Sequence, residues 1–374
     1  MRETTKNRIL CLLFGGFLLV MGALFLFAPK EDFSPREKRY LAEAPRAELS
    51  EILSGRFGRQ AEDWAADQLP GRNFFLNLSA EADRWENLQV TKEIYRGKSG
   101  RLYESPAAYD EAVIRRNMAA LNAFAETVAQ PVDLALVPSA GFWMAEDIPG
   151  LADPYEDEAI VESAYGLAAP GIRPLNLIKS FREQPEKETL YYRTDHHWTS
   201  RGAYTAYRGY METKGRACPM PEDYRVETVE GFYGTTYARA CFWNLPAESL
   251  ELWDSGGTYT VRFSERDGEY TGLFFLERLQ EADKYPVWLD GNHPLVTITN
   301  HDPAAQGKLL VIRDSYANCL GCFLADSYAQ VTLVDLRYYK QPVSELCKEE
   351  GFDDILFLYS VGNFMRDSNI VWLQ

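Results

Sequence analysis

Three apolar segments near the end of the chain constrain its fold more than any other feature. They cover residues 309–312, 331–336 and 355–359, and helix-prone segments near 316–327 and 342–350 separate them. Strands that are apolar on both faces are typical of a parallel sheet covered by helices on both sides. The sequence therefore predicts an α/β fold, in which binding and catalytic sites form beyond the carboxyl ends of the strands.

A serine stands at the first of these strand ends. Ser315 follows the apolar strand and precedes a helix-prone segment, while Asp335 and Asn363 follow the other two strands. The free backbone N–H groups and partial positive charge of a helix N-terminus favour an oxyanion as a serine attacks an acyl carbon. The amide of Asn363 would supply a further donor. Taken alone, Asp314–Ser315 also fits a simple helix N-cap.

Two of the four histidines lie beside an acid in the segment 194–199, Thr-Asp-His-His-Trp-Thr. In extended chain, Asp195 and His197 project to the same side, so the carboxylate would fix the tautomer of the ring and steady its positive charge. With Ser315 as nucleophile, these residues predict a Ser-His-Asp triad. A metal site at His196–His197 is the alternative. We expect no metal, because adjacent histidines on a turn rarely aim at one ion.

The N-terminus predicts the compartment of the protein. Residues 1–8 contain three basic side chains, and an uncharged apolar run of twenty residues follows at 9–28. Such a run spans about 30 Å as a helix, enough to cross a bilayer, and the basic flank predicts a cytoplasmic N-terminus. A cleaved signal peptide is the alternative, but the run is long for one and the cleavage site is poor. Both readings export everything after Lys30.

The rest of the chain divides by composition. Residues 29–95 are charged and helix-prone, and we expect a stalk with packing helices. Residues 96–374 are predicted to form one catalytic domain, in which the Tyr-, Thr- and Gly-rich stretch at about 218–305 indicates an antiparallel β-rich insertion. The net charge of −16 argues against binding to phosphate backbones. No nucleic-acid partner is therefore expected.

The segment Thr194–Thr199, followed by Gly202–Ala203, closely resembles the Thr-Asp-x-His-Trp-Thr signature of the alginate O-acetyltransferase group, and its paired histidines resemble the DHHW family of exported bacterial proteins. Both groups are SGNH-hydrolase-like. Familiar members carry the serine first and the acid–histidine pair last, whereas here that pair precedes Asp314–Ser315 and Val361–Asn363. The order resembles a circularly permuted arrangement of the same sheet. The resemblance covers about residues 96–374.

This resemblance implies roles for single residues. Ser315 would be the nucleophile, His197 the general base and Asp195 the partner of that base. Asn363 corresponds to the oxyanion asparagine, although Phe364 stands where the family has an aspartate.

Four further residues adjoin these positions and are predicted to bind substrate or to support the site. Arg313 would bind a substrate carboxylate or pair with an acid, and Tyr316 follows the nucleophile directly. His196 stands where the alginate relatives have a small polar residue, so its role is open. Trp198 is more typical of a packing residue than of a ligand-stacking one.

The resemblance also implies an activity. The protein would be an O-acetyltransferase that acts on a cell-surface or secreted polysaccharide, with a membrane-bound O-acyltransferase as the partner that supplies acetyl groups and with no cofactor. A carbohydrate acetylesterase uses the same triad with water as acceptor, and a non-catalytic polysaccharide-binding or assembly subunit would keep the same fold. The sequence thus favours an acetyltransferase, and these two other functions on the same membrane-anchored scaffold are the alternatives.

Overall fold

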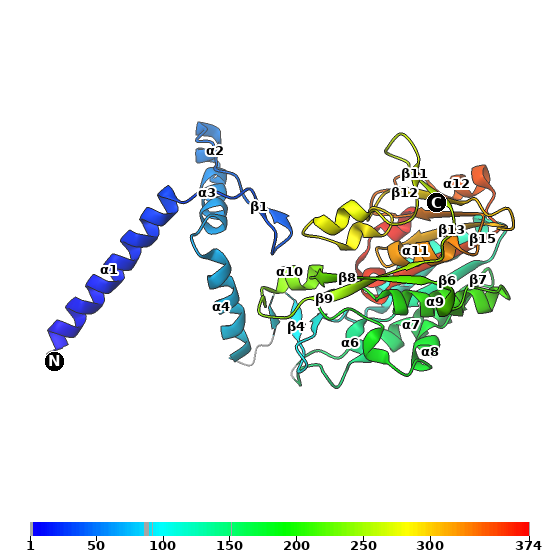
Figure 1. Ribbon diagram of the computed structural model, residues 1–374, viewed down its shortest axis with the longest axis horizontal. Helices are drawn as coiled ribbons and strands as arrows, with labels where there is room; N and C mark the ends of the chain where they lie inside the picture. The colour runs from blue at the N-terminus through cyan, green and yellow to red at the C-terminus, as the bar shows by residue number, and fades with distance from the viewer. Residues whose placement is uncertain (1–2, 86–89, 92, 151, 374) are drawn as a thin grey trace. The chain divides into compact units, whose positions relative to one another are not determined.

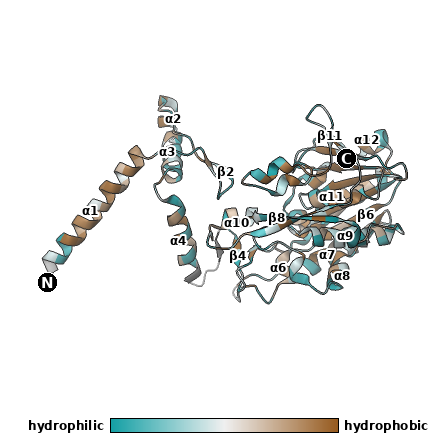
Figure 2. Ribbon diagram, viewed as in Figure 1, coloured by the Kyte–Doolittle hydropathy of each residue, from teal (hydrophilic) through white to brown (hydrophobic). Residues whose placement is uncertain are grey.

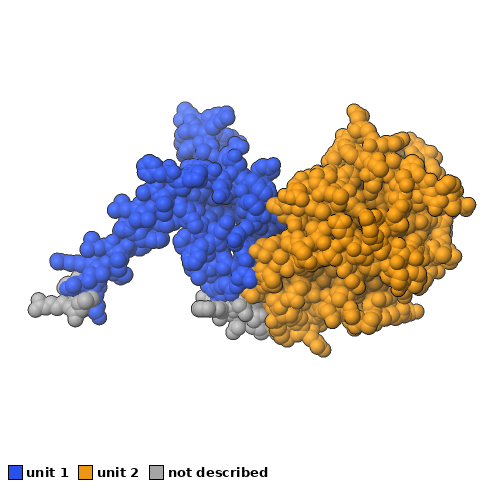
Figure 3. Space-filling view, viewed as in Figure 1, with its two compact units in different colours: residues 1–91, 238–244 blue, residues 92–237, 245–374 orange. Residues whose placement is uncertain are grey.

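A computed structural model of the chain describes residues 3–85, 90–91, 93–150 and 152–373. Residues 1–2 of the predicted cytoplasmic N-terminus, and residues 86–89 and 92 of the predicted stalk, lie outside the described residues. The chain forms two compact units, which Figure 3 shows in different colours. The first unit consists of residues 1–91 and 238–244, and the second of residues 92–237 and 245–374.

The first unit begins with the apolar helix α1 (Glu3–Phe27), whose residues are mostly hydrophobic (Figure 2). Its segment Thr5–Phe27 is long and apolar enough to cross a bilayer. The Phe25 ring contacts the ring of Trp64 edge to face, with centroids 5.2 Å apart. The remaining elements of this unit are short: β1 (Phe33–Ser34), β2 (Arg39–Tyr40), α2 (Leu49–Leu53), α3 (Arg56–Asp67), α4 (Arg72–Trp85) and β3 (Val90–Thr91).

The second unit contains an eight-stranded sheet with the strand order β11-β10-β12-β14-β13-β15-β6-β7 (Figure 1). Strands β14, β13, β15, β6 and β7 are parallel to one another, and β12 pairs antiparallel with β14. The strands have these bounds: β6 (Val132–Val137), β7 (Ile172–Leu175), β10 (Tyr259–Phe263), β11 (Tyr270–Thr271), β12 (Leu295–Asn300), β13 (Lys308–Arg313), β14 (Gln330–Val334) and β15 (Asp354–Ser360). The mostly parallel α/β fold predicted from the apolar strands is confirmed.

Helices occur between the strands of the second unit. Their bounds are α5 (Glu111–Thr127), α6 (Ala140–Trp143), α7 (Asp157–Gly166), α8 (Leu177–Arg182), α9 (Ser200–Lys214), α10 (Thr235–Ala240), α11 (Ala317–Ala325), α12 (Val343–Glu350) and α13 (Val361–Arg366). Short 3₁₀ turns complete the chain: η1 (Lys187–Thr189), η2 (Pro221–Asp223), η3 (Leu276–Gln280), η4 (Tyr285–Val287) and η5 (Asn369–Trp372).

Hydrophobic side chains are buried on both faces of the sheet. On one face, Leu121 and Phe124 of α5 pack with Leu134, Ile312 and Phe357 of three neighbouring strands. Successive strand residues point to opposite faces, so the intervening buried residues face the other side, which α9 and α11 cover. This double burial explains why the strands read as continuous apolar runs.

Helix α9 runs against the direction of the parallel strands. At its C-terminal end, Lys214 donates to Asp133 at the start of β6 (2.8 Å) and also pairs with Asp354 at the start of β15. Because the helix is about 22 Å long, its N-terminal end lies at the carboxyl edge of the sheet. The turn that precedes α9 is therefore delivered to the edge where β13 ends at Arg313.

The segment predicted as a β-rich insertion divides between two sheets. Strands β8 (Arg225–Phe232) and β9 (Glu248–Asp254) form a separate antiparallel pair, as do the short strands β4 (Ile94–Arg96) and β5 (Leu102–Glu104) nearer the N-terminus. Strands β10, β11 and β12 instead extend the main sheet as its antiparallel edge. Their alternating pattern indicated antiparallel strands, but pattern alone did not show that β14 is their partner.

Candidate active site

The turn that carries Asp195 and His197 is held by backbone contacts on both sides. Tyr191 and Trp198 form an isolated antiparallel bridge, and the N–H of Tyr192 donates to the carbonyl of His197 (3.2 Å). Thr199 then caps α9, because its hydroxyl accepts from the N–H of Gly202 at 3.3 Å. A Cβ on Gly202 would lie 2.3 Å from the carbonyl oxygen of Leu190, so only glycine fits there.

The structure brings Ser315, His197 and Asp195 together. The Oγ of Ser315 lies 2.7 Å from Nε2 of His197, and Nδ1 of His197 lies 2.5 Å from Oδ1 of Asp195. All three side chains are buried. The serine hydroxyl donates to Nε2, which leaves Nδ1–H to donate to the carboxylate, and this is the geometry of a nucleophile, a base and an orienting acid.

Asp195 is held ionised by its surroundings. Burial opposes its charge, but the neighbouring His197 and His196 rings and the hydrogen bond from His197 outweigh burial, so the pKa of Asp195 lies well below its ordinary value. Its second oxygen, Oδ2, accepts from the N–H (2.6 Å) and the hydroxyl (2.9 Å) of Thr235. A carboxylate fixed at both oxygens cannot rotate away from the ring.

His197 lies between two other rings. Tyr285 stacks on one face, with centroids 3.9 Å apart and an interplanar angle of 13°. His196 lies against the other face at 3.9 Å and 35°. Burial lowers the pKa of His197 below its ordinary value, His196 lowers it further, and Asp195 opposes both without cancelling them. The ring is therefore neutral at neutral pH, as a general base must be.

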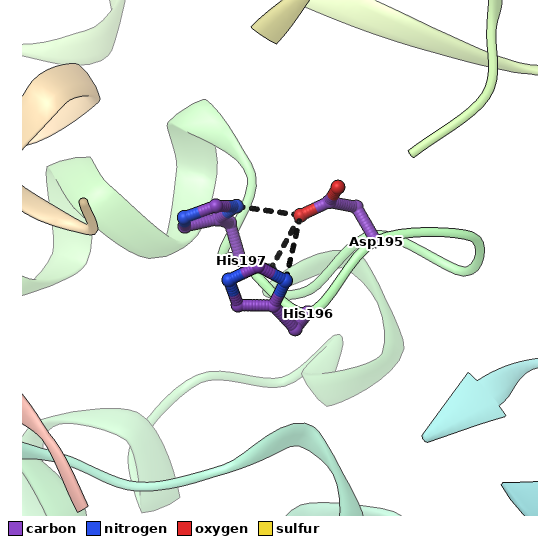
Figure 4. Close-up of side chains that lie close together, drawn as sticks. All are labelled: Asp195, His196 and His197. Atoms are coloured by element: carbon purple, nitrogen blue, oxygen red, sulfur yellow. Dashed lines mark hydrogen bonds and ion pairs between the residues drawn. The ribbon is translucent and has the colours of Figure 1, made fainter. Parts of the chain in front are cut away.

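His196 supports the acid rather than pairing with the nucleophile. Figure 4 shows its ring turned toward the same carboxylate as His197, with Nδ1 3.6 Å from Oδ1 of Asp195. Nδ1 also lies 3.1 Å from the hydroxyl of Thr235. Because that hydroxyl already donates to Asp195, Nδ1 of His196 carries the hydrogen. Its side chain is about a quarter exposed, whereas His197 is buried.

Asp195, His196 and His197 form the one group of potential metal ligands found among the described residues, with ligand atoms within 4.8 Å of one another. Their hydrogen bonds fit a metal poorly. Both ring nitrogens of His197 are already committed, one to Asp195 and one to Ser315. A metal ion would have to replace one of these contacts, which supports the interpretation of the pair as an acid–base unit.

Asp314 fixes the position of the nucleophile. Its Oδ1 accepts from the N–H of Tyr316 at 3.0 Å, which fixes the turn just before α11. Its Oδ2 accepts from both the N–H and the hydroxyl of Ser360 and from Nδ2 of Asn363, each at 2.8 Å. Asn363 is thus tied to Asp314, and its predicted role as an oxyanion donor stays a prediction.

A backbone donor remains free beside the nucleophile. No hydrogen-bond acceptor for the N–H of Ser315 is found among the described residues. This N–H stands just before α11, where the positive end of the helix favours negative charge. It is the donor best placed to receive the oxygen of an acyl group attacked by Ser315.

Arg313 is fully buried beside this network. Its Nη1 donates to Oδ1 of Asn292 (2.8 Å) and lies 3.4 Å from Oδ2 of Asp335, which also binds Arg337. Burial lowers the pKa of Arg313. Of the two predicted roles, pairing with an acid is the one that its contacts support. Its Nε and Nη2 have no partner among the described residues.

Trp198 and Tyr316 brace the turn against the nucleophile. The indole N–H of Trp198 donates to the carbonyl of Tyr316 at 3.0 Å, and the hydroxyl of Tyr316 donates to the carbonyl of His196. Both side chains are buried. Their contacts hold the histidine segment at the start of α11, and their predicted contact with substrate stays a prediction.

Three residues of the site carried no signal in the sequence. Tyr285 and Thr235 begin two short helical turns, η4 and α10, with no sequence motif around them. Glu248 of β9 accepts from the N–H groups of Arg193 and Thr194, both at 2.7 Å, and so fixes the turn from behind. Burial raises the pKa of Glu248. Only homologous sequences, in which these positions vary together with the triad, would mark them.

Two family models match the chain. Residues 174–334 match the DHHW protein family, and residues 94–231 match the SGNH hydrolase-like domain of the acetyltransferase AlgX. A search of the curated proteins found no match.

Solved structures with the same fold include a DHHW family protein from Eubacterium siraeum, at 22% identity and a TM-score of 0.64 over 73% of this chain and 91% of that one. PatB1 from Bacillus cereus matches at 19% identity and a TM-score of 0.63, over 75% of this chain and 99% of that one. A second PatB1 structure, with a sulfonyl adduct, matches at 19% and 0.64 over 75% and 98%. These matches show the SGNH-hydrolase-like fold, and with the two family models they confirm that this chain resembles DHHW proteins and the AlgX-type acetyltransferase domain.

Proposed function

We propose that this protein is a membrane-anchored O-acetyltransferase that modifies a polysaccharide outside the cytoplasm. The observation that carries the proposal is the 2.7 Å contact between Ser315 Oγ and His197 Nε2, with Asp195 behind the ring. The match of residues 94–231 to an acetyltransferase domain supports acetyl as the group transferred. In this proposal residues 96–374 are the catalytic domain, 29–95 the stalk and 9–28 the anchor.

The reaction proceeds in two halves through an acetyl-serine. In the first, Ser315 Oγ attacks the carbonyl carbon of the acetyl donor while His197 Nε2 takes the hydroxyl proton. The backbone N–H of Ser315 stabilises the oxyanion, and collapse expels the leaving group, which receives the proton from His197. In the second, His197 takes the proton of a sugar hydroxyl, whose oxygen attacks the acetyl-serine carbonyl. The sugar ester forms, and Ser315 regains its proton.

The anchor determines where this chemistry occurs. The basic residues ahead of the apolar run at 9–28 favour a cytoplasmic N-terminus, which puts the catalytic unit outside the membrane. No cytoplasmic acetyl donor reaches that side unaided. The proposal therefore includes a membrane-bound O-acyltransferase that carries acetyl groups across the bilayer to Ser315.

An acetylesterase is the second candidate, because the same acetyl-serine reacts with water as readily as with a sugar unless water is kept out. A non-catalytic binding subunit is the third. The ordered hydrogen bonds from Ser315 to Asp195 favour an enzyme over a binding subunit, since a binding subunit needs no aligned base.

The full-length chain in detergent should be incubated with p-nitrophenyl acetate, with and without oligosaccharide acceptors. We expect acetylated sugar from the wild type and from Ser264→Ala, a serine-to-alanine control at an exposed position, and none from Ser315→Ala. Acetate without sugar ester would identify an esterase. A sulfonyl fluoride should label Ser315, as a sulfonyl adduct is present in one PatB1 structure, and failure to label would favour the binding subunit.

A further inference from the structure

A pocket of about 300 Å³ lies in the second unit, away from the triad. Strands β8, β9 and β10, the following loop and the end of α11 form its walls. Asp326 of this pocket and Ser315 stand at opposite ends of α11, a separation of about 14 Å along a nine-residue helix. The pocket is therefore not part of the reacting centre.

The floor of the pocket is a rigid hydrogen-bond acceptor. Oδ1 of Asp326 accepts from the hydroxyls of Ser255 (2.7 Å) and Tyr259 (2.5 Å), and its Oδ2 accepts from that of Tyr224 (2.7 Å). Burial raises the pKa of Asp326. Three hydroxyl donors hold this carboxyl in one orientation, so it meets a ligand hydroxyl without rearranging.

The lining of the pocket includes both acidic and apolar side chains. Glu227 is exposed, and no cation or donor pairs with its carboxylate among the described residues. Asp254 pairs with Arg225 at 2.9 Å. The lining thus carries three carboxyl groups and one cation, and it also includes Leu276, an exposed apolar side chain.

We propose that this pocket binds a sugar unit that carries hydroxyl groups and no acidic group, as a second subsite for the acceptor polysaccharide. The inference rests on the proposed function for the identity of the polymer. Pockets of this size that combine apolar surface with a few fixed polar groups are typical small-ligand sites, and a sugar presents both an apolar face and hydroxyl donors. A uronate would meet two unneutralised carboxyl groups and be repelled.

The continuous chain segment 273–289 connects this subsite to the triad. The pocket wall at Leu273 and Phe274 pairs with the chain at 287–289, through Leu289 N–H to Leu273 O (3.1 Å) and the bridge between Phe274 and Trp288. That chain follows Tyr285, which stacks on His197. Binding energy gained at the subsite therefore serves to hold the polymer while another of its units reacts at Ser315.

The test is a calorimetric titration of the full-length chain in detergent with three hexasaccharides: an N-acetylglucosamine hexamer, a glucosamine hexamer and a galacturonate hexamer. We expect the first two to bind and the third to bind at least about tenfold more weakly. Glu227→Lys should weaken the glucosamine hexamer at least tenfold. Glu277→Lys, the same change at an exposed glutamate outside the pocket, should leave its binding unchanged.

Equal binding of the galacturonate hexamer, or unchanged glucosamine binding by Glu227→Lys, would overturn the subsite. Thermal unfolding midpoints of the two variants must match, so that a loss of binding is not a loss of fold. Sulfonyl fluoride labelling of Ser315 in the wild type tests the proposed function separately, because labelling needs the triad and not the pocket.

Discussion

Replacement of Tyr285 by leucine tests whether the ring stacked on His197 contributes to catalysis. The face of the tyrosine lies 3.9 Å from the imidazole centroid and nearly parallel to it, and both side chains are buried. His197 becomes a cation in the transition state, and the negative face of an aromatic ring stabilises a desolvated cation by about 1–2 kcal/mol. Leucine fills similar space without that face.

The expected loss follows from this energy. Tyr285→Leu should slow the labelling of Ser315 by a sulfonyl fluoride about 5–30-fold, and it should lower the pKa of His197, because the imidazolium loses the negative face of the ring. Tyr285→Phe keeps the ring and removes only a hydroxyl that lies 3.5 Å from the carbonyl of Ser315, a weak contact. It should remain close to the wild type in both measurements.

Two assays measure these effects. The labelling rate is followed by mass spectrometry, and the pKa of His197 by NMR of chain labelled at histidine, which contains only four histidines. Equal rates for the leucine and phenylalanine variants would refute the reasoning. A raised pKa in Tyr285→Leu would refute it too, since it would mean that the tyrosine acts by excluding water rather than by stabilising charge.

Four further experiments test the rest of the site. Asp195→Asn should reduce the labelling rate of Ser315 about 10³–10⁴-fold with little change in fold, because it leaves His197 in the wrong tautomer; a loss under tenfold would contradict this. Because burial lowers the pKa of His197, the labelling rate of the wild type should rise with pH to a plateau, with its midpoint below the ordinary histidine value of 6.5, and a midpoint above 6.5 would argue against a buried base. Asn363→Ala removes one of four donors to Asp314 and should cost about 1–3 kcal/mol of unfolding free energy, measured by thermal unfolding. Treatment with a chelator should leave the labelling rate unchanged, and a loss restored by zinc would favour a metal site.

The sequence predicted the sheet well because each core strand is apolar throughout its length. The segments expected at 309–312 and 355–359 are the centres of β13 and β15. The edge strands were harder, because their alternating pattern fits any sheet with one buried face. That β12 pairs with β14 depends on the length and path of the chain between them, which local pattern does not encode.

The core of the candidate site was accessible for a different reason. The spacing of Asp195 and His197 is a local property, and Ser315 was indicated by its place at a strand end. Their meeting depends on α9 and α11, which deliver the two segments to one edge of the sheet. Tyr285 and Thr235 were invisible, because each contacts the triad from a segment whose course no sequence pattern determines.

The hydrogen bonds of Asp314 decide which group accepts the proton of Ser315. Asp314 is the nearest carboxylate in sequence, directly before Ser315. In the folded chain its two oxygens accept four hydrogen bonds, from Tyr316, Ser360 and Asn363. These four donors already occupy both oxygens of the carboxylate. Nε2 of His197 instead accepts the hydrogen bond of the Ser315 hydroxyl at 2.7 Å, so in the proposed mechanism the proton moves to the imidazole.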